Sequence, residues 1–445
     1  MTSNEKNYTT SMKIGRVKAL LKQISISAAV SSFVGKLSVA LVEQVVFSGS
    51  SFLFQVYLIR KMGLVAFGEF SVMMSVLLGV STVYSALVIN PLLILGPGNY
   101  ASRFKQYMPR LFFLHWVVAG IASFAAFCLI AILATYAISE TSLSLKSALC
   151  GAIALLFILF NWLSRRTAYS AGRAPVALCS SLTYSGLLFG MLIGLDQLDH
   201  ITVETAFFSL GIAGGTSGAV AFIILRGMGN EDCGPVYMTD VIVKHWSMGR
   251  WMLPTGILRW IPVYGFITLI PALASLSDAA EFRIMVLLTL PLTLLVTGAS
   301  GVLQPRLVRA WGRSGFSKSA VQTIVVSIAV GLGYAALLFC IGPRMLSALL
   351  QDETLITWDG LCFSAGLSVL ILLTNILGLV LKASERVHQE TYIVAVIAAV
   401  ALSAGIPTLI TYGIGGLFIT TISCYVVGCI LALIFVRSVL SNVER

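Results

Sequence analysis

Long apolar runs alternate with short polar stretches from one end of the chain to the other. A helix needs about 20 mostly apolar residues to cross the hydrocarbon core of a bilayer. The runs reach that length, so the pattern predicts an all-α polytopic membrane protein with about twelve transmembrane helices. The predicted spans are 37–58, 67–91, 111–137, 146–164, 175–195, 203–226, 252–274, 281–304, 320–342, 358–381, 390–411 and 414–436.

The polar intervals divide the chain into four parts. Residues 1–36 form an N-terminal tail in which apolar positions recur at helical spacing among lysines and arginines, which predicts a basic helix on a membrane surface. Residues 37–226 form a first lobe of six spans, and residues 227–251 form a cytoplasmic linker. Residues 252–445 form a second lobe of six spans with a short cytoplasmic C-terminus.

The two predicted lobes resemble each other in sequence. The matching marks are Gly35-Lys36 with Gly249-Arg250, Gly68-Glu69-Phe70 with Ala280-Glu281-Phe282, and Asn90-Pro91 with Gln304-Pro305. Six spans is an even number, so both lobes would enter the membrane in the same direction. Parallel repeats of this kind are a known plan for transporters, with the binding site at the repeat interface. Chance likeness between apolar sequences is the alternative.

Composition agrees with a membrane protein, and charge sets its orientation. The chain has 445 residues, of which 58% are hydrophobic and 11% charged, and its mean hydropathy is +0.95. The net charge of +11 does not indicate nucleic acid, because the basic residues are scattered between the spans. Most of the 29 lysines and arginines fall on the side of the N-terminus, and the opposite loops hold Arg60, Lys61, Lys146, Arg283 and Arg344. This asymmetry predicts cytoplasmic termini.

The seventh predicted span carries a charge and three helix-breaking residues. Arg259 lies well inside an apolar segment that also contains Pro254, Pro262 and Pro271. A cation at mid-depth costs about 2.5–3.5 kcal/mol if it faces lipid. Arg259 is therefore expected to face a polar cavity and to bind an anionic group. The three prolines, with Gly49 in the first span, are candidate hinges.

Polar side chains also line up within the membrane. In the first span they recur at the spacing of one helix face, as Gln44, Ser48, Ser51 and Gln55. The tenth span has a similar series in Ser364, Ser368, Asn375 and Lys382, and Asn161 lies near the end of the fourth span. Such residues can bind substrate in a cavity, or they can hold helices together by hydrogen bonds. We expect Gln44, Ser48, Ser51, Gln55, Asn161 and Asn375 to contact substrate.

Glu43 and Arg259 are the foremost candidates for function, because intramembrane ionisable residues are rare. They could pair with each other across the lobe interface. Alternatively, Arg259 binds substrate while Glu43 carries a coupling ion, either a proton or a sodium ion. His115 is interpreted as an interior histidine and Gly211–Gly218 as a site of close helix packing. No metal-binding cluster, nucleotide loop or catalytic arrangement is found, so no cofactor and no enzyme activity are expected.

Several segments resemble one family of transporters. They are the run from Glu43 to Pro91, the stretch Arg165-Arg166-Thr167-Ala168-Tyr169-Ser170-Ala171-Gly172-Arg173, the segment Trp246–Trp251 and the sequence Gln304-Pro305-Arg306-Leu307. Together they are similar to the polysaccharide transporter (Wzx-type flippase) family of the multidrug/oligosaccharidyl-lipid/polysaccharide (MOP) exporter superfamily.

This resemblance implies a V-shaped, MATE-like pair of six-helix lobes in the bacterial inner membrane. It also implies translocation of a polyprenyl-diphosphate-linked oligosaccharide for surface polysaccharides such as O-antigen or exopolysaccharide. Membrane lipids and a polysaccharide polymerase or export machinery are the implied partners. A multidrug/cation antiporter of the same superfamily and a membrane-embedded polysaccharide polymerase or ligase are the alternatives.

Overall fold

The computed structural model of the protein describes residues 3–136, 143–227, 234–293, 315–349 and 358–443, with a few positions between 303 and 311. For residues 3–38 it describes the backbone alone, so the predicted surface contact of the N-terminal tail stays a prediction. Every regular element within these ranges is a helix. The predicted all-α membrane fold is therefore confirmed.

Nine helical runs among the described residues are long and apolar enough to cross a bilayer. Two of them, Val39–Leu95 and Val387–Ser441, are 57 and 55 residues long, far more than one crossing needs. Each contains a glycine with a positive φ, a conformation that glycine adopts readily, and the helix is interrupted there: Gly63 (φ 73°) or Gly413 (φ 61°). These breaks fall between predicted spans. The eighth predicted span, 281–304, extends beyond the described residues, and the total of twelve stays a prediction.

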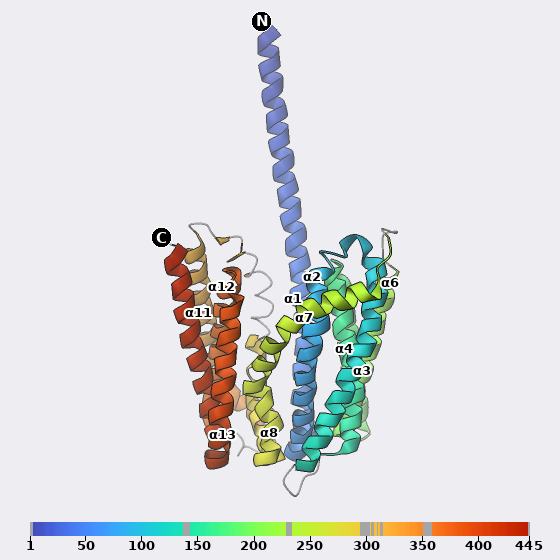
Figure 1. The fold of residues 1–445 in the computed structure, drawn as a ribbon, viewed down its shortest axis with the longest axis vertical. Helices are drawn as coiled ribbons and strands as arrows, with labels where there is room; N and C mark the ends of the chain where they lie inside the picture. Colours follow the sequence, from blue (N-terminus) through green and yellow to red (C-terminus); the bar gives the residue numbers. More distant parts are fainter. Residues whose placement is uncertain are drawn as a thin grey trace.

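The N-terminal lobe is a compact group of helices around α4 and α6 (Figure 1). Its elements are α1 (Ser3–Tyr84), the π-helix η1 (Ser85–Ile89), α2 (Asn90–Leu95), η2 (Ala101–Arg103), α3 (Phe104–Tyr136), α4 (Leu145–Ser170), α5 (Ala174–Gln197) and α6 (Val203–Arg226).

Glycines bring α6 close to α4. A Cβ atom on Gly211 would lie 3.2 Å from the Cα of Ala154, and one on Gly214 would lie 3.0 Å from the carbonyl oxygen of Phe157. Small residues allow such approach between membrane helices. The interpretation of Gly211–Gly218 as a packing surface is confirmed.

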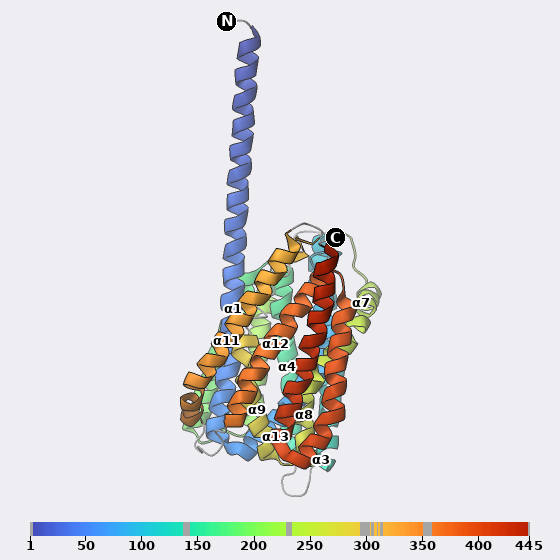
Figure 2. The ribbon, with the colours of Figure 1, turned by 90° about the vertical axis from the view of Figure 1, so that its left-hand side faces the viewer.

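The C-terminal lobe contains α7 (Met238–Trp260), η3 (Ile261–Gly265), α8 (Phe266–Leu273), α9 (Leu276–Leu287), α11 (Phe316–Leu349), α12 (Trp358–Ala383) and α13 (Val387–Val443). Figure 2 shows α12 flanked by α11 and α13. The core includes the rings of Phe282 in α9 and Phe363 in α12, each of which stacks on Phe418 in α13.

Helix α7 begins earlier than the sequence predicted. Its first half lies in the segment expected to be a linker, and Figure 1 shows it crossing over the N-terminal lobe. His245 is buried there and its Nε2 atom lies 2.7 Å from the Tyr107 hydroxyl. Hydropathy alone predicts a loop for this polar segment, whereas contact with the first lobe makes it a packed helix.

The lobes touch along the second half of α1. A Cβ on Gly68 would lie 2.0 Å from the carbonyl oxygen of Leu276, at the start of α9. The indole of Trp260 in α7 donates to the carbonyl oxygen of Ser75, 2.9 Å away. In Figure 1 both termini lie at one end of the molecule, and the contact between Gly68 and Leu276 lies on the segment that follows the turn at the other end. The lobes are therefore closed together at the end away from the termini.

Candidate substrate-binding cavity

Arg259 lies in the last turn of α7, directly before the π-helical turn η3. Pro262 lies within that turn, and because proline has no N–H it cannot make the usual bond to the preceding turn. The local break predicted for this span is thus present at Pro262. Pro254 lies inside α7 and Pro271 inside α8.

The Arg259 guanidinium connects three elements. Its Nη1 donates to Oδ1 of Asn375 in α12 at 2.9 Å, and its Nη2 donates to Oε1 of Glu390 in α13 at 2.6 Å. The Nζ of Lys382 lies 3.0 Å from the same Glu390 oxygen. Two cations therefore share one carboxylate, and the cluster has a formal charge of +1.

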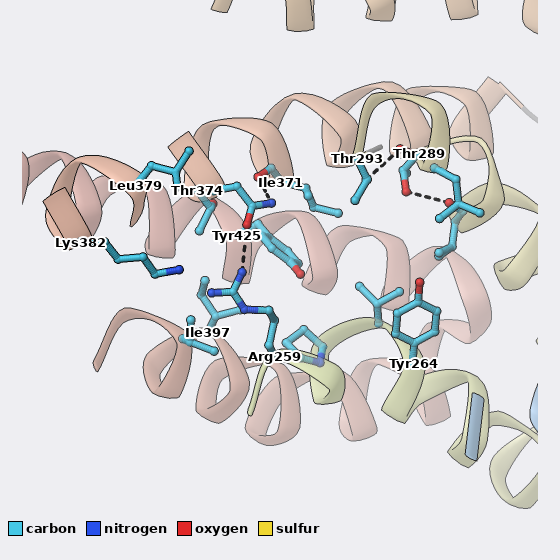
Figure 3. A pocket seen from close by; sticks show the side chains of 16 residues that line it. Arg259, Tyr264, Thr289, Thr293, Ile371, Thr374, Leu379, Lys382, Ile397 and Tyr425 are labelled. Carbon is cyan, nitrogen blue, oxygen red and sulfur yellow. Dashed lines mark hydrogen bonds between the residues drawn. The ribbon is translucent and has the colours of Figure 1, made fainter. Parts of the chain in front are cut away.

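This cluster borders a cavity of about 400 Å³ within the C-terminal lobe (Figure 3). The Arg259 side chain is 45% exposed and that of Lys382 is 35% exposed, whereas Glu390 is 8% exposed. Hydroxyl groups line the same cavity, from Tyr264, Thr289, Thr293, Thr374 and Tyr425. The positive charge is thus open to a ligand while the negative charge lies behind it.

The location of this cavity differs from the prediction. We expected a binding site between the lobes. The lining residues instead all belong to the C-terminal lobe: they lie on α7, η3, α9, α12 and α13 and in residues 289–293, which follow α9. Asn375 and Lys382 line it as the series in the tenth span predicted. Ser364 and Ser368 of the same series instead donate to backbone carbonyl groups inside the helix packing.

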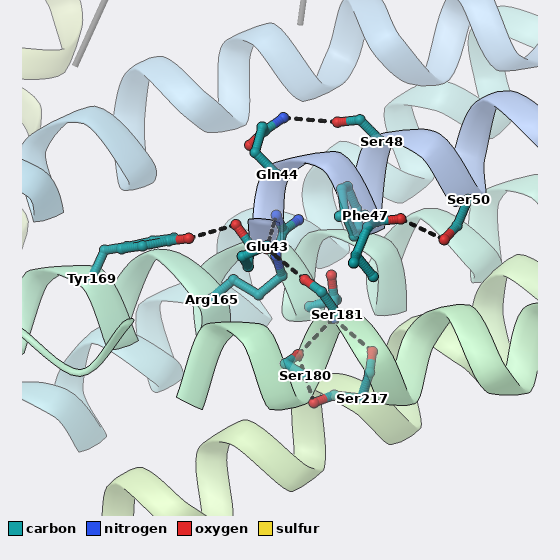
Figure 4. Close-up of polar contacts among 12 residues, drawn as sticks. Glu43, Gln44, Phe47, Ser48, Ser50, Arg165, Tyr169, Ser180, Ser181 and Ser217 are labelled. Carbon is teal, nitrogen blue, oxygen red and sulfur yellow. Dashed lines mark hydrogen bonds and ion pairs between the residues drawn. The ribbon is translucent and has the colours of Figure 1, made fainter. Parts of the chain in front are cut away.

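Glu43 does not meet Arg259. It is 1% exposed and forms an ion pair with Arg165 of α4, whose Nε donates to Glu43 Oε1 at 2.6 Å (Figure 4). Ser181 donates to the same oxygen and Tyr169 to the other one. The interpretation of Glu43 and Arg259 as a pair across the lobes is wrong in this conformation, because each has another partner. An ion-coupling role for Glu43 would require the pair with Arg165 to open.

The four polar side chains predicted to share one face of the first span do not form a common site. Gln44 donates to Ser48 at 2.7 Å, and Ser51 donates to the backbone of Phe47. Gln55 instead accepts a hydrogen bond from Arg283 across the lobe interface, at 2.6 Å. None of these residues lines the cavity beside Arg259. Gly49 lies within continuous helix and has open space around it.

Asn161 lies in the interior of the N-terminal lobe. Its amide nitrogen donates to Ser180 of α5 and to Ser217 of α6, at 3.1 and 2.6 Å. The side chain is 1% exposed. This geometry joins three helices by hydrogen bonds and places Asn161 away from the cavity of the other lobe. His115 is likewise interior, with its Nδ1 atom 2.8 Å from the Tyr84 hydroxyl.

Sequence reasoning missed three buried charged residues: Glu390 and Arg165, which belong to the two ion clusters, and Arg283, which belongs to neither. Glu390 was placed at the edge of a span, and Arg165 and Arg283 were counted as loop charges that set the topology. A signal for Arg165 did exist, since a buried Glu43 needs a counter-charge. Among the described residues, no group of three or more His, Cys, Asp or Glu side chains could hold a metal ion.

Comparison with known proteins identifies the fold. No protein-family profile matches the chain, and no curated protein sequence matches it. The inward-facing form of a multidrug resistance MATE transporter of the MOP superfamily is similar, with a TM-score of 0.75 and 12% identity over 90% of this chain and 95% of that chain. The outward-facing form of such a transporter gives a TM-score of 0.67 and 13% identity, over 92% of this chain and 96% of that one.

A third similar structure is a MOP-superfamily transporter from Pyrococcus furiosus, described as having a binding pocket of reversed polarity that suggests a different function. Its TM-score is 0.65, with 13% identity over 92% of this chain and 96% of that chain. At these identities the likeness shows the fold alone: the chain has a MATE-like fold.

Proposed function

We propose that the protein is a flippase that moves a polyprenyl-diphosphate-linked oligosaccharide from the cytoplasmic to the periplasmic leaflet of a bacterial inner membrane. The observation that carries this proposal is the net positive cluster of Arg259, Lys382 and Glu390 at an open cavity. A guanidinium fork and an ammonium group suit the oxygens of a diphosphate. The transporter fold supplies two lobes that can open to alternate sides.

The size of the cavity fits a head group better than a whole substrate. Ligand pockets commonly measure about 300–1,000 Å³, and this cavity of about 400 Å³ is at the small end of that range. In this proposal the diphosphate binds beside Arg259 while the polyprenyl tail stays in lipid. The sugars need a polar route, since an unpaired hydroxyl in hydrocarbon costs about 4–8 kcal/mol.

An ion-coupled multidrug or cation antiporter is the second candidate, because similar structures are multidrug resistance transporters. A cation needs an available carboxylate in the membrane. Glu43 and Glu390 are each already paired with an arginine. This pairing favours an anionic substrate.

A deletion strain separates the two functions. A flippase predicts that lipid-linked repeat units accumulate in the cytoplasmic leaflet, that surface polysaccharide is lost and that drug sensitivity is unchanged. Drug hypersensitivity with normal polysaccharide would support the antiporter instead. Restoring the gene with Arg259→Ala is expected to yield protein that inserts but does not restore export, whereas full export would remove Arg259 from the mechanism.

Coupling to a proton or sodium gradient through Glu43, cytoplasmic termini, and association with a polysaccharide polymerase or export machinery are further parts of this proposal. Cytoplasmic termini would place the closed end of the lobes at the periplasm. The conformation described above would then be the one that receives substrate from the cytoplasmic leaflet.

A further inference from the structure

Arg283 is a buried arginine that belongs to neither ion cluster. Its side chain is 2% exposed, on α9. Its Nη2 donates to Oε1 of Gln55 at 2.6 Å, whereas Nε and Nη1 have no hydrogen-bond partner among the described residues. None of the ion pairs in the described part of the chain includes it. Arg283 is thus a buried cation without a counter-charge there.

Such a residue is unfavourable for the structure that contains it. Burying a charge without a partner of opposite sign is costly, and an uncharged side chain of similar size could hold the same position. Unpaired charges within membrane proteins therefore indicate function. Two buried guanidinium nitrogens without an acceptor among the described residues indicate that the missing partner is an acceptor, and the positive charge favours an anion.

Arg283 lies directly behind the cavity wall. Its Cζ is 5.4 Å from the ring centre of Tyr264, which lines the cavity. Val286, three residues further along α9, also lines it. Figure 3 shows Lys382, Arg259 and Tyr264 in this order along the cavity. Because Arg283 lies beside Tyr264, it would be a third cation in this row, after Lys382 and Arg259.

The hydrogen bond to Gln55 crosses from one lobe to the other. It joins α9 to α1, the two helices that also meet at Gly68 and Leu276. When the lobes open at this end, α9 and α1 must separate and the bond to Gln55 must break. The guanidinium of Arg283 would then be free for a ligand from the cavity.

We propose that Arg283 is a second anion-binding site, which receives the phosphate groups of the substrate from Arg259 when α9 separates from α1. This inference rests on the proposed function for its substrate. It assigns the two arginines to successive steps, with Arg259 binding in the conformation described here and Arg283 binding after the lobes have opened. A planar fork of N–H groups is suited to phosphate oxygens in both places.

Transport and stability together distinguish a binding role from a structural one. We expect Arg283→Gln to reduce flipping of the lipid-linked oligosaccharide by about tenfold or more, the factor expected for one lost charge-assisted contact. The same variant should unfold at the same or a higher temperature, because it removes a buried charge that has no counter-charge among the described residues. Arg283→Lys, which keeps the charge, should retain more transport than Arg283→Gln. Arg344→Gln is the control, since Arg344 is exposed and predicted on the same side of the membrane.

A lower unfolding temperature of Arg283→Gln, with no rescue by Arg283→Lys, would overturn the inference and make Arg283 structural. A second measurement does not depend on the substrate. A reporter Leu290→Cys in the cavity wall, in a full-length chain with its native cysteines replaced, is treated with an anionic and a cationic thiol reagent of equal size. Thr293→Cys is the second reporter if the first variant does not fold.

The ratio of the anionic to the cationic labelling rate measures the local electrostatic potential. Arg283→Gln should lower this ratio by about threefold, as expected for a unit charge acting through water over about 10 Å, and Arg344→Gln should not change it. An unchanged ratio in Arg283→Gln would overturn the anion site. If the ratio falls as expected but the parent protein does not bind farnesyl diphosphate, the anion site stands and the proposed lipid-linked substrate fails.

Discussion

Glu43 in the N-terminal lobe and Glu390 in the C-terminal lobe each contact an arginine, but in opposite surroundings. Glu43 and Arg165 are 1% and 7% exposed, and the hydroxyl groups of Ser181 and Tyr169 also donate hydrogen bonds to the Glu43 carboxylate. Glu390 instead holds two cations, and Arg259 is 45% exposed at a cavity. The same residue types thus form an enclosed, saturated pair in one lobe and an open cluster with excess positive charge in the other. The second cluster can bind an anionic ligand because it has an excess of positive charge and because that charge is exposed at a cavity.

The first way to test the comparison is the stability of the two carboxylate variants. Glu43→Gln leaves Arg165 buried without its partner, so the free energy of unfolding should fall by about 3–5 kcal/mol. Glu390→Gln should cost about 1 kcal/mol or less, because its cationic partners are open to water. Chemical denaturation of both variants in the same detergent measures the difference.

A Glu43→Gln variant as stable as the parent would contradict the structural role. If that stable variant also lost the dependence of transport on an ion gradient, Glu43 would be the ion carrier that the sequence suggested. A destabilised variant that keeps its gradient response would exclude the carrier role.

The second test concerns affinity. Arg259→Gln removes a charge-assisted contact worth about 1.5–3 kcal/mol, so farnesyl diphosphate should bind about 10- to 100-fold more weakly. Stability should change little. Arg250→Gln is the matched control, with the same change on an exposed residue of the same helix. An equal loss of affinity in both variants would mean that the net charge of the protein attracts the ligand and that Arg259 does not contact it.

The smallest effects separate two amides that the sequence treated alike. Asn161→Ala should lower the free energy of unfolding by about 0.6–2 kcal/mol, the range for hydrogen bonds between membrane helices, and leave ligand affinity unchanged. Asn375→Ala should weaken binding by about fivefold, because Asn375 holds one arm of Arg259 and each 1.4 kcal/mol corresponds to tenfold. Thermal unfolding and calorimetric titration of both variants check the two readouts. If Asn161→Ala weakened binding and Asn375→Ala only lowered stability, the ligand would bind elsewhere than in the cavity beside Arg259.

Hydropathy predicted the fold because span length and polar interruptions are local properties of the sequence. The turns at Gly63 and Gly413 lie where one apolar run ends and the next begins. The start of α7 was misplaced because its polar first half is stabilised by contact with another lobe, as at His245. Local hydropathy contains no information on that contact.

The candidate site was predicted only in part, for a related reason. Arg259 and Asn375 were found because a charge and an amide within an apolar segment are unusual wherever they lie. Arg165, Arg283 and Glu390 occur at span ends, where charges normally contact water or lipid head groups, and their burial depends on which helices pack against them. The pairing of Glu43 with Arg165 in place of Arg259 likewise depends on tertiary structure.

The central claim is that the cavity of the C-terminal lobe selects an anionic head group. The most direct measurement is calorimetric titration of the purified full-length protein and of Arg259→Gln with farnesyl diphosphate and, separately, with the lipophilic cation tetraphenylphosphonium. The parent protein should bind the diphosphate in preference to the cation, and Arg259→Gln should lose that preference. Binding of the cation but not the diphosphate, with no effect of Arg259→Gln, would contradict the claim.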